Sequence, residues 1–515
     1  MKKTIILLMV IMIMLNYGCR TEITNTEQQE YNYLVAETGE INVPLTPFES
    51  LDPLTTENMS YFYLSGLIFE GLFTLDENLR PKENLATAYD LKDNKMVVKI
   101  KDGITFHDGS KLTARDVKYS LDHIKNSMKG AYYNLVVNNI TKDFVLSANA
   151  VDNNTIVFDY SGDGPFLKEY LIFPIVKSDS VNSKFPLGTG PYKIESYENK
   201  KEMILTAYEN YHDEAPSIAR VKGIVHDDKD LIYTSLETGR IQVSTAWNQS
   251  FHRFFNNEYF QAKKYPSNEL YFLFLNPNAK LNTNDFRLAI RRSLDKDRII
   301  KVALDDQGVK TTSFINPDSY FYRMSQDIPN VDKSISLLSG KKMSLNFYLY
   351  WKNPIQVKIA TMVSESLNSV GIKVNLIGNA SESFETYSEN LKNGAYDIAL
   401  SSMSVNIIPD YSYLLNSGIF PYTSDELKVL NDKLKSTNTD EELLEVTNKI
   451  DEKINSENIF VPIVYKMNAL IYSNAIVGDI KPNLIFPYNS LKSAYFTTKE
   501  KDKINNETKD ESVEN

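Results

Sequence analysis

Cysteine is nearly absent from this chain, and basic residues are outnumbered by acids. Cys19 is the only cysteine in 515 residues, so a fold held together by internal disulfides is excluded. The chain has 56 Lys and Arg against 67 Asp and Glu, and no cluster of basic residues interrupts the excess of acids. A nonspecific phosphate binder needs a concentrated basic face. The composition therefore predicts no nucleic-acid partner.

Histidine is scarce as well, and the motifs of catalysis are incomplete. The five histidines are scattered without His-Glu-x-x-His or another close metal-ligand spacing, so we predict no metal site. Ser293 and Lys296 have the spacing of a penicillin-binding nucleophile pair, but the Ser-Asp-Asn and Lys-Thr-Gly motifs are absent. Gly188-Thr189-Gly190 lacks the third glycine of a dinucleotide loop. The sequence therefore predicts no catalytic residue and no cofactor.

The first residues predict export. Lys2 and Lys3 precede an apolar stretch, Ile5–Leu15, which is too short to span a bilayer, since a spanning helix needs about 20 residues. A positively charged start followed by a short apolar segment is typical of a cleaved secretory signal. We therefore expect residues 1–18 to be removed.

Cys19 has the position of a lipid attachment site. It follows the apolar segment where bacterial lipoprotein signals end, although Asn16 stands where such signals usually carry leucine. A lone thiol has no disulfide partner within the chain, and thioether attachment of lipid would give it a role. We predict that Cys19 carries the lipid and that the polar residues 19–32 form a tether to the membrane. The alternative is a secreted chain that is cut nearby, with Cys19 lost or unused.

The rest of the chain is long enough for at least two domains. Roughly 465 residues lie between the polar ends, which is more than one hydrophobic core supports. Strand patterns dominate residues 33–265. From Glu269 onward, the buried strand LYFLFLNP and the amphipathic helix Asp285–Leu294 open an α/β pattern, in which Asp295 caps a further helix. Residues 499–515 are charged and almost free of apolar side chains, so we expect a disordered tail.

Residues 97–121, VVKIKDGITFHDGSKLTARDVKYSL, place strand, turn and helix signals in close succession. Apolar and polar residues first alternate as in a half-buried strand, and Asp108-Gly109 then supplies a turn. Thr113 opens a helix, because its hydroxyl can cap the first turn and Asp116 is the N3 acid of a capping box.

This segment and several other motifs resemble the family 5 (oligopeptide/dipeptide-type) solute-binding proteins of bacterial ABC importers, in the lipoprotein form. The other motifs, which follow the family's order, are Leu51-Asp52-Pro53, Leu67–Phe73 (LIFEGLF), Gly188–Tyr192 (GTGPY), Tyr208–His212, Phe286–Arg298 (FRLAIRRSLDKDR) and Tyr396–Leu400 (YDIAL). The resemblance covers nearly all of the chain between its polar ends.

The resemblance implies an α/β fold with two lobes, joined by two crossing strands. It is a periplasmic-binding-protein-like fold of type II with a subdomain inserted in the first lobe. Mapped onto this chain, the first lobe takes residues 33–55, 185–267 and 476–498, the inserted subdomain residues 56–184, and the second lobe residues 268–475.

The resemblance also implies ligand-binding residues. Many peptide-binding relatives carry a tryptophan and, three residues on, an aspartate that pairs with the peptide's α-ammonium. In this chain Met403 occupies the position of the tryptophan and Asn406 the position of the aspartate, with Ser404 between them. An amide cannot neutralise an ammonium, so either Asp410 supplies the charge or the ligand lacks a free amino terminus. Trp247 is a further candidate for the cleft, and an ordinary packing role is the alternative for it.

Together these expectations describe a binding protein and not an enzyme. It would be a monomer, anchored outside the cytoplasm by its lipid (in the periplasm if the organism has an outer membrane), and would deliver short peptides to the permease subunits of an ABC transporter. The missing ammonium anchor keeps nonpeptide ligands open, among them a nickel-chelator complex, a sugar or an opine. A signal-peptide receptor shares the same features, and an exported hydrolase is a remote alternative.

Replacing Cys19 with alanine tests the lipid anchor. We expect Cys19→Ala to release the protein from cells or to leave the precursor unprocessed, because the thiol is the predicted attachment point. Fractionation and the mass of the mature amino terminus measure both effects. Normal processing with unchanged membrane retention would refute the assignment.

Overall fold

The computed structural model describes residues 39–134, 145–161, 166–246, 253–255, 257–323, 329–409, 411–415, 418–437 and 439–497. The predicted export signal, the lipid site at Cys19, the tether and the tail lie outside these residues, and so do Trp247 and Asp410. In the described part of the chain, no helix has the length and apolar character needed to cross a membrane.

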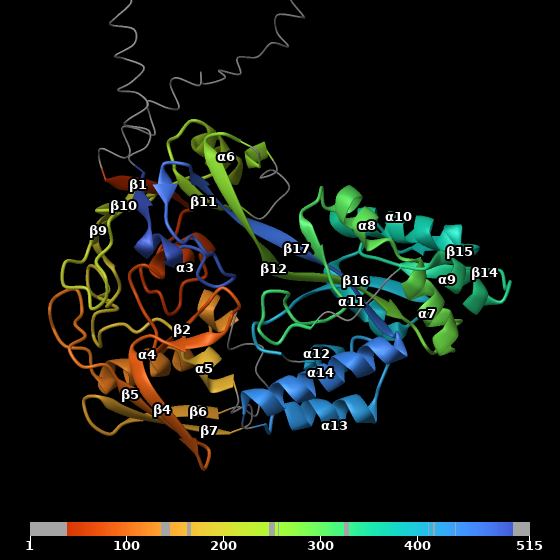
Figure 1. The fold of residues 1–515 in the computed structure, drawn as a ribbon, viewed down its shortest axis with the longest axis horizontal. Coiled ribbons are helices and arrows are strands. Elements are labelled where there is room, and N and C mark those ends of the chain that lie inside the picture. Colours follow the sequence, from red (N-terminus) through yellow and green to blue (C-terminus); the bar gives the residue numbers. More distant parts are fainter. Residues whose placement is uncertain are drawn as a thin grey trace, which may run out of the picture.

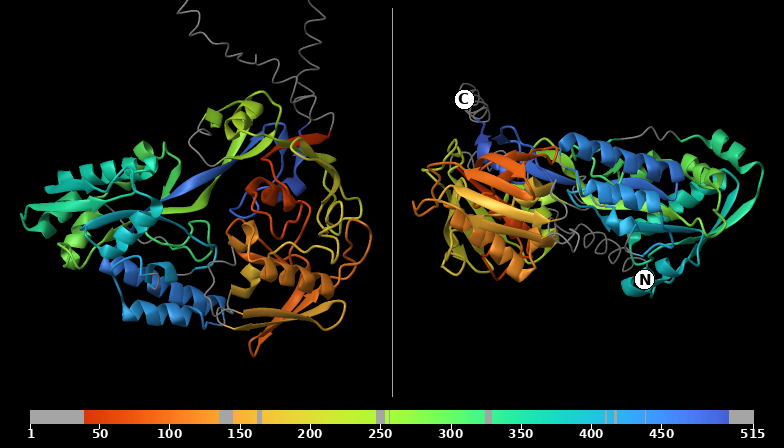
Figure 2. Two further views of the ribbon diagram at one scale, coloured as in Figure 1. Left: turned by 180° about the vertical axis from the view of Figure 1, so that it is seen from behind. Right: turned by 90° about the horizontal axis from the view of Figure 1, so that it is seen from below.

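Two bodies lie side by side and are joined by two long strands, β12 (Phe260–Leu275) and β17 (Phe460–Ser473) (Figures 1 and 2). The two strands pair antiparallel along their length and belong to a seven-stranded sheet in the order β11-β17-β12-β16-β14-β15, with β13 paired to β17. This sheet therefore runs from one body into the other.

The first body, the first lobe, contains a four-stranded sheet in the order β1-β10-β9-β8. Its strands show the period-2 burial of a sheet with one face on the core; in β9, for example, Met203 and Leu205 are buried. The elements of this lobe are β1 (Glu40–Leu45), α3 (Met59–Ser65), β8 (Tyr192–Glu198), β9 (Glu202–Ala207), β10 (Arg220–Val225), α6 (Lys229–Glu237), β11 (Val243–Ala246), β18 (Ile476–Val477), a 3₁₀ turn (Asn489–Ser493) and β19 (Tyr495–Phe496).

Below this lobe in Figure 1 lies the inserted subdomain, a second four-stranded sheet with a helix packed on it. The strand order is β4-β5-β7-β6, all antiparallel. The elements are β2 (Phe73–Leu75), β3 (Pro81–Glu83), β4 (Ala86–Lys92), β5 (Lys95–Ile100), α4 (Ala114–Ser127), β6 (Val145–Ala150), β7 (Thr155–Ser161) and α5 (Leu167–Tyr170).

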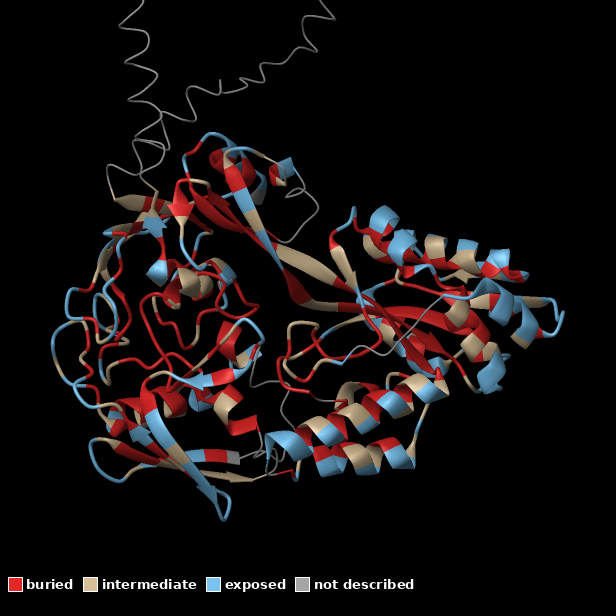
Figure 3. Cartoon of the chain, in the orientation of Figure 1, coloured by how far each residue is buried: buried red, intermediate tan, exposed pale blue. Residues whose placement is uncertain are grey.

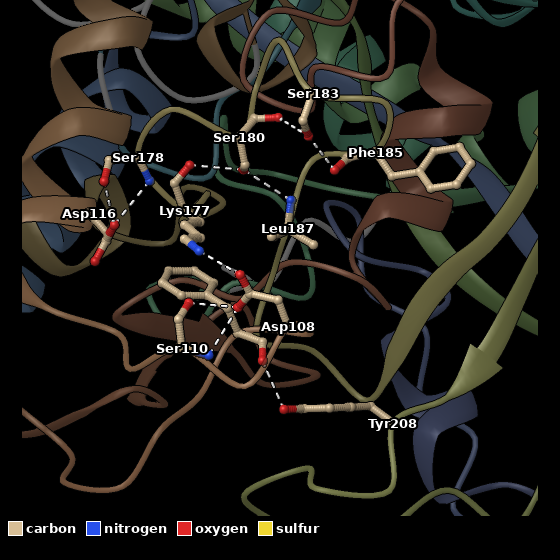
Figure 4. Close-up of polar contacts among 11 residues, drawn as sticks. Asp108, Ser110, Asp116, Lys177, Ser178, Ser180, Ser183, Phe185, Leu187 and Tyr208 are labelled. Atoms are coloured by element: carbon tan, nitrogen blue, oxygen red, sulfur yellow. Dashed lines mark hydrogen bonds and ion pairs between the residues drawn. The ribbon is translucent and has the colours of Figure 1, made fainter.

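The predicted helix start at Thr113 is confirmed, with a different use of its hydroxyl. The backbone NH and the hydroxyl of Thr113 both donate to one oxygen of Asp116, at 2.9 and 2.8 Å. The other oxygen of Asp116 accepts bonds from the NH and hydroxyl of Ser178 (Figure 4). Lys177 pairs with Asp108 of the predicted turn, and the Tyr208 hydroxyl donates to the carbonyl of Phe106 (Figure 4).

The second body, the second lobe, is a sheet covered by helices on both faces. The apolar run LYFLFL forms the second half of β12, as predicted, and alternate residues serve opposite faces: Tyr271 and Leu273 belong to one core cluster, Phe272 and Phe274 to another. Figure 3 shows this buried sheet between helices whose outer faces are exposed.

The helices of the second lobe include the two predicted from the sequence. Asp295 caps the second of them by accepting the NH of Arg298 at 2.9 Å. The elements of this lobe are α7 (Asn284–Ser293), α8 (Lys296–Ala303), β13 (Gly308–Lys310), α9 (Val331–Leu338), β14 (Met343–Tyr348), α10 (Pro354–Ser369), β15 (Ile372–Ile377), α11 (Phe384–Asn393), β16 (Ile398–Ser404), α12 (Ser412–Leu415), α13 (Asp425–Leu434) and α14 (Asp440–Glu457).

A buried carboxylate, Glu70, joins the first lobe to the inserted subdomain. One of its oxygens accepts the hydroxyl of Tyr211 at 2.9 Å and the amide of Asn84 at 3.4 Å. The other accepts the hydroxyl of Thr189 at 2.9 Å and lies 2.9 Å from Nε2 of His212. Three of the motifs recognised in the sequence, around residues 70, 189 and 211, therefore meet at one side chain.

Glu70→Ala should lower the free energy of unfolding by about 3–5 kcal/mol, because several buried polar groups lose their acceptor at once. Urea unfolding of the variant measures the loss. Glu83→Ala, an exposed acid on β3, is the matched control and should change stability by less than about 0.5 kcal/mol. An equally small effect of both substitutions would contradict the role given to Glu70.

Candidate functional site

The pairing of the two long strands is interrupted where they cross between the lobes. Pro266 pairs with Met467 and Leu270 with Tyr465, so residues 267–269 face a single residue of β17. Such a bulge bends a strand and leaves backbone groups out of the ladder. The crossing is therefore the place where the sheet offers polar backbone to other groups.

Two loops of the second lobe occupy these backbone groups. The carbonyl of Ser267 accepts the side-chain amide of Asn316 at 2.9 Å, and the carbonyl of Asn268 accepts the NH of Val405 at 2.7 Å. The side-chain amide of Asn268 also donates to the Ser404 hydroxyl at 2.6 Å. The loop after β16 and the loop around residue 316 are thus held against the same short stretch of β12.

The end of β16 and the loop after it carry the site residues predicted within the described chain. Met403 and Asn406 are half-buried and Ser404 is exposed, while the neighbouring Val405 and Ile407 are buried. Inward packing of these two apolar side chains fixes the loop at the end of the strand. The structure therefore brings Met403, Ser404 and Asn406 together at the crossing. Trp247 and Asp410 lie outside the described residues.

Glu269, at the end of the bulge, already has partners. Lys466 of β17 lies 3.3 Å from one of its oxygens, and the hydroxyl of Tyr271 donates to the other. Burial, followed by the negative charge of Glu269, raises the pKa of Tyr271 above its ordinary value. The phenol therefore stays a hydrogen-bond donor, and the charge of Glu269 is balanced within the protein.

Aromatic residues cover the first-lobe side of the crossing. The rings of Tyr63 and Tyr488 meet edge to face at 6.4 Å, and Tyr265 of β12 is buried beside them. Burial raises the pKa of Tyr63 to about 12 and that of Tyr265 well above its ordinary value. These phenols are neutral at any physiological pH.

Sequence reasoning missed the loop of residues 311–323, which we call the bridging loop. At its start, the hydroxyl of Ser313 donates to Asp451 of α14, and the hydroxyl of Tyr411 donates to the other oxygen of Asp451 at 2.9 Å. Lys296, half of the pair that resembled a nucleophile motif, instead donates to the carbonyl of Thr311 at 2.8 Å. Buried polar groups of the second lobe therefore fix the base of the bridging loop.

The far end of the bridging loop contacts the inserted subdomain. The NH of Tyr320 donates to the carbonyl of Asn78, and its hydroxyl donates to Glu169, both at 2.9 Å. The guanidinium of Arg80 lies 4.7 Å from the centre of the Tyr320 ring, and Phe321 meets Phe166 edge to face. The two lobes therefore touch through this loop as well as through the crossing strands.

Three carboxyl groups around the bridging loop share one property, a pKa raised by burial to about 7. Asp451 and Glu169 accept bonds from the loop's hydroxyls, and in both cases these bonds oppose the effect of burial without cancelling it. For Asp318, in the loop itself, burial is the only cause of the raised pKa. Protonation at this loop therefore occurs near neutral pH.

No group of three or more His, Cys, Asp or Glu side chains is placed to hold a metal ion within the described ranges. The site instead consists of amide, hydroxyl, carboxyl and aromatic groups on two loops and two strands. Such groups can bond a polar ligand and stack on it.

Replacing Asp451 with asparagine should change how stability depends on pH. The folded-state pKa of Asp451 lies above that of an unfolded aspartate, so the stability it contributes is full below about pH 4 and is lost as pH rises to about 7. We therefore expect wild type to lose stability relative to Asp451→Asn by up to about 1.4 kcal/mol per pH unit in that window.

Urea unfolding at pH 5, 6, 7 and 8 measures this difference. Glu169 and Asp318 titrate in both proteins and cancel, and Glu452→Gln, an exposed neighbour on α14, should show no such trend. A difference between wild type and Asp451→Asn that stays constant with pH would mean that Asp451 is ionised throughout.

Comparison with known proteins connects these features to a family. The profile of the bacterial extracellular solute-binding proteins, family 5 (middle region), matches residues 80–419. The chain is 25% identical over 399 residues to the oligopeptide-binding protein AppA of Bacillus subtilis, which covers 67% of this chain and 69% of that protein.

Two solved structures share the fold. The ABC transporter substrate-binding protein CtaP of Listeria monocytogenes superposes with a TM-score of 0.72 at 22% identity, covering 89% of this chain and 99% of that one. The periplasmic murein tripeptide-binding protein MppA, in its unliganded open form, gives a TM-score of 0.77 at 17% identity and covers 89% and 97%. The predicted α/β fold of two lobes is thereby confirmed.

Proposed function

Since this chain belongs to the bacterial extracellular solute-binding proteins, family 5, and is thus the substrate-binding component of an ABC importer, we propose that it captures short peptides between its lobes and delivers them to the permease subunits. Proteins of this family bind solutes and do not transform them. The family predicted from the sequence is confirmed; the peptide ligand is our proposal.

The observation that carries the proposal is the interrupted crossing of β12. Residues 267–269 leave the ladder with β17 there, and the side chains of Asn316, from the bridging loop, and Ser404, from the end of β16, bond to Ser267 and Asn268. An extended peptide offers an NH and a C=O at every residue, and such groups bond it whatever its side chains are. AppA, the relative described above, is named for oligopeptide binding, which agrees with this chemistry.

In this proposal, the two lobes move about the bulged crossing and close on the ligand. Ser404 and Asn406 would bond the peptide backbone or its end, and Met403 would contribute apolar contact. Trp247 and Asp410 remain proposed contributors from outside the described residues. The lobe boundaries that we propose are those given from the sequence, except that α3 is assigned to the first lobe; the bridging loop of the second lobe contacts the inserted subdomain.

The protein would act as a monomer outside the cytoplasm, anchored by lipid on Cys19 and carried on the tether of residues 19–32. This part of the proposal rests on the amino-terminal sequence alone.

A second candidate function is supported by Asn406. Its side chain is neutral where many peptide-binding relatives carry an acid, and a nickel-chelator complex, a sugar or an opine needs no such anchor. Mass spectrometry of small molecules released by denaturing the full chain, purified in detergent, separates the two. A mixture of short peptides supports peptide capture, and a single nonpeptide solute overturns it in favour of the second function.

Charge changes in the loop after β16 should alter how the end of a peptide is read. Asn406→Asp adds a carboxylate at the crossing, so we expect a peptide with a free amino terminus to gain affinity by about tenfold over its N-acetylated form. If Asp410 supplies a charge in wild type, Asp410→Asn should weaken binding of the peptide with a free amino terminus and leave binding of the acetylated peptide unchanged. Calorimetry with one released peptide measures both; no change in either variant would show that residues 402–414 do not read the terminus.

A further inference from the structure

Asp318 is a carboxylate at the junction of the lobes that has no partner. It is half-buried, and its side chain receives no hydrogen bond and no ion pair from the described residues. Burial raises its pKa to about 7, and no neighbouring positive charge opposes that effect. A carboxylate in this condition is poised to accept a cation.

The position of Asp318 is fixed from both sides. Two residues before it, Asn316 donates its amide to the carbonyl of Ser267 at the crossing, at 2.9 Å. Two residues after it, the NH of Tyr320 donates to the carbonyl of Asn78 in the inserted subdomain, at 2.9 Å. Asp318 therefore sits at the middle of the short span that connects β12 to the opposite body.

Local bonds hold this span in one conformation. The Asn316 side chain accepts the NH of Asp318 at 3.0 Å, and the carbonyl of Asn316 accepts the NH of Ser319 at 2.8 Å. A turn closed in this way presents a side chain at its tip without a further cost of ordering on binding. The carboxylate is thus preorganised.

The other acids near the bridging loop already have partners. Glu269 is paired with Lys466, Glu169 accepts the hydroxyl of Tyr320, and Asp451 accepts the hydroxyl of Ser313. Asp318 is the acid here that has neither a hydrogen-bond donor nor a cation as partner among the described residues.

The positively charged side chains of this region contact groups other than Asp318. Arg80 lies over the ring of Tyr320, and Arg323 donates to the carbonyls of Tyr320 and Tyr322. Lys168 lies 3.7 Å from Asp440. None of these cations pairs with Asp318, so the described residues supply no counter-charge for it.

We propose that Asp318 binds a positively charged group of the ligand, an alkylammonium or guanidinium carried by the amino terminus or by a basic side chain of a captured peptide. This inference rests on the proposed function and adds a preference for cationic ligands. Asp318 supplies the charge that the neutral Asn406 lacks, from a different loop at the same crossing.

Four pools of random tri- to pentapeptides test the inference. The first pair of pools lacks Lys and Arg; one pool has a free amino terminus and the other an acetylated one. In the second pair both pools are acetylated; each peptide carries one lysine in one pool and one norleucine in its place in the other. Full-length protein in detergent is equilibrated with equal amounts, and retained peptides are counted by mass spectrometry. The first pair tests a terminal ammonium, and the second pair tests a side-chain ammonium.

We expect wild type to retain the cationic pool of at least one pair about tenfold or more over its neutral counterpart. In Asp318→Asn, which preserves shape, that ratio should fall to about 1, while retention of neutral peptides stays the same and shows that the protein is folded. Asp332→Asn removes an exposed acid from α9 and should leave the ratio unchanged.

An unchanged ratio in Asp318→Asn, or equal retention of cationic and neutral pools by wild type, would overturn the assignment of Asp318. Retention of no pool by wild type would instead refute peptide capture, and the inference would fall with it.

Discussion

The buried carboxylate of Glu70 fixes the inserted subdomain on the first lobe, and the contacts across the lobes depend on that placement. The chain leaves the first lobe near residue 70 and returns near residue 189, and Glu70 bonds both the returning Thr189 and Tyr211 beyond it. Gly188 and Gly190 lie so close to the backbone of Ile68 that a Cβ at either would come within 2.1 or 2.7 Å of it. The hydrogen bonds of Glu70 and the lack of a side chain at Gly188 and Gly190 thus both hold the inserted subdomain against the first lobe. This placement sets the positions of Glu169 and Asn78, which Tyr320 contacts.

The two links between the lobes differ in their physics. The crossing strands form a covalent link whose ladder is interrupted at residues 267–269, which permits bending. The bridging loop forms a noncovalent link, made by Tyr320 and by the edge-to-face contact of Phe321 with Phe166. At the start of the loop, the buried Asp451 accepts the hydroxyl of Ser313. Its other oxygen accepts the hydroxyl of Tyr411. A change at α14 can therefore reach both loops of the site without touching a ligand.

Local signals predicted much of the fold, and the site only in part. Alternation in LYFLFL, the cap at Asp295 and the acid at Asp116 each act within a few residues, so the sequence shows them directly. The bridging loop has no such periodicity, and its importance comes from Tyr320 meeting Glu169, 151 residues away. Asp451 on an amphipathic helix resembles a surface acid until its burial is known. Met403, Ser404 and Asn406 were predicted from family resemblance and stay a prediction, whereas the bond between Ser404 and Asn268 required the structure.

The contact of Tyr320 with Glu169 also bears on how much a ligand must contribute to closure. A binding-competent state that is rarely populated reduces apparent affinity by its population, and any contact that favours this state within the protein itself reduces that penalty. The bridging loop makes its contacts to the inserted subdomain with the protein's own groups alone. Part of the contact between the lobes is therefore made without any contribution from a ligand.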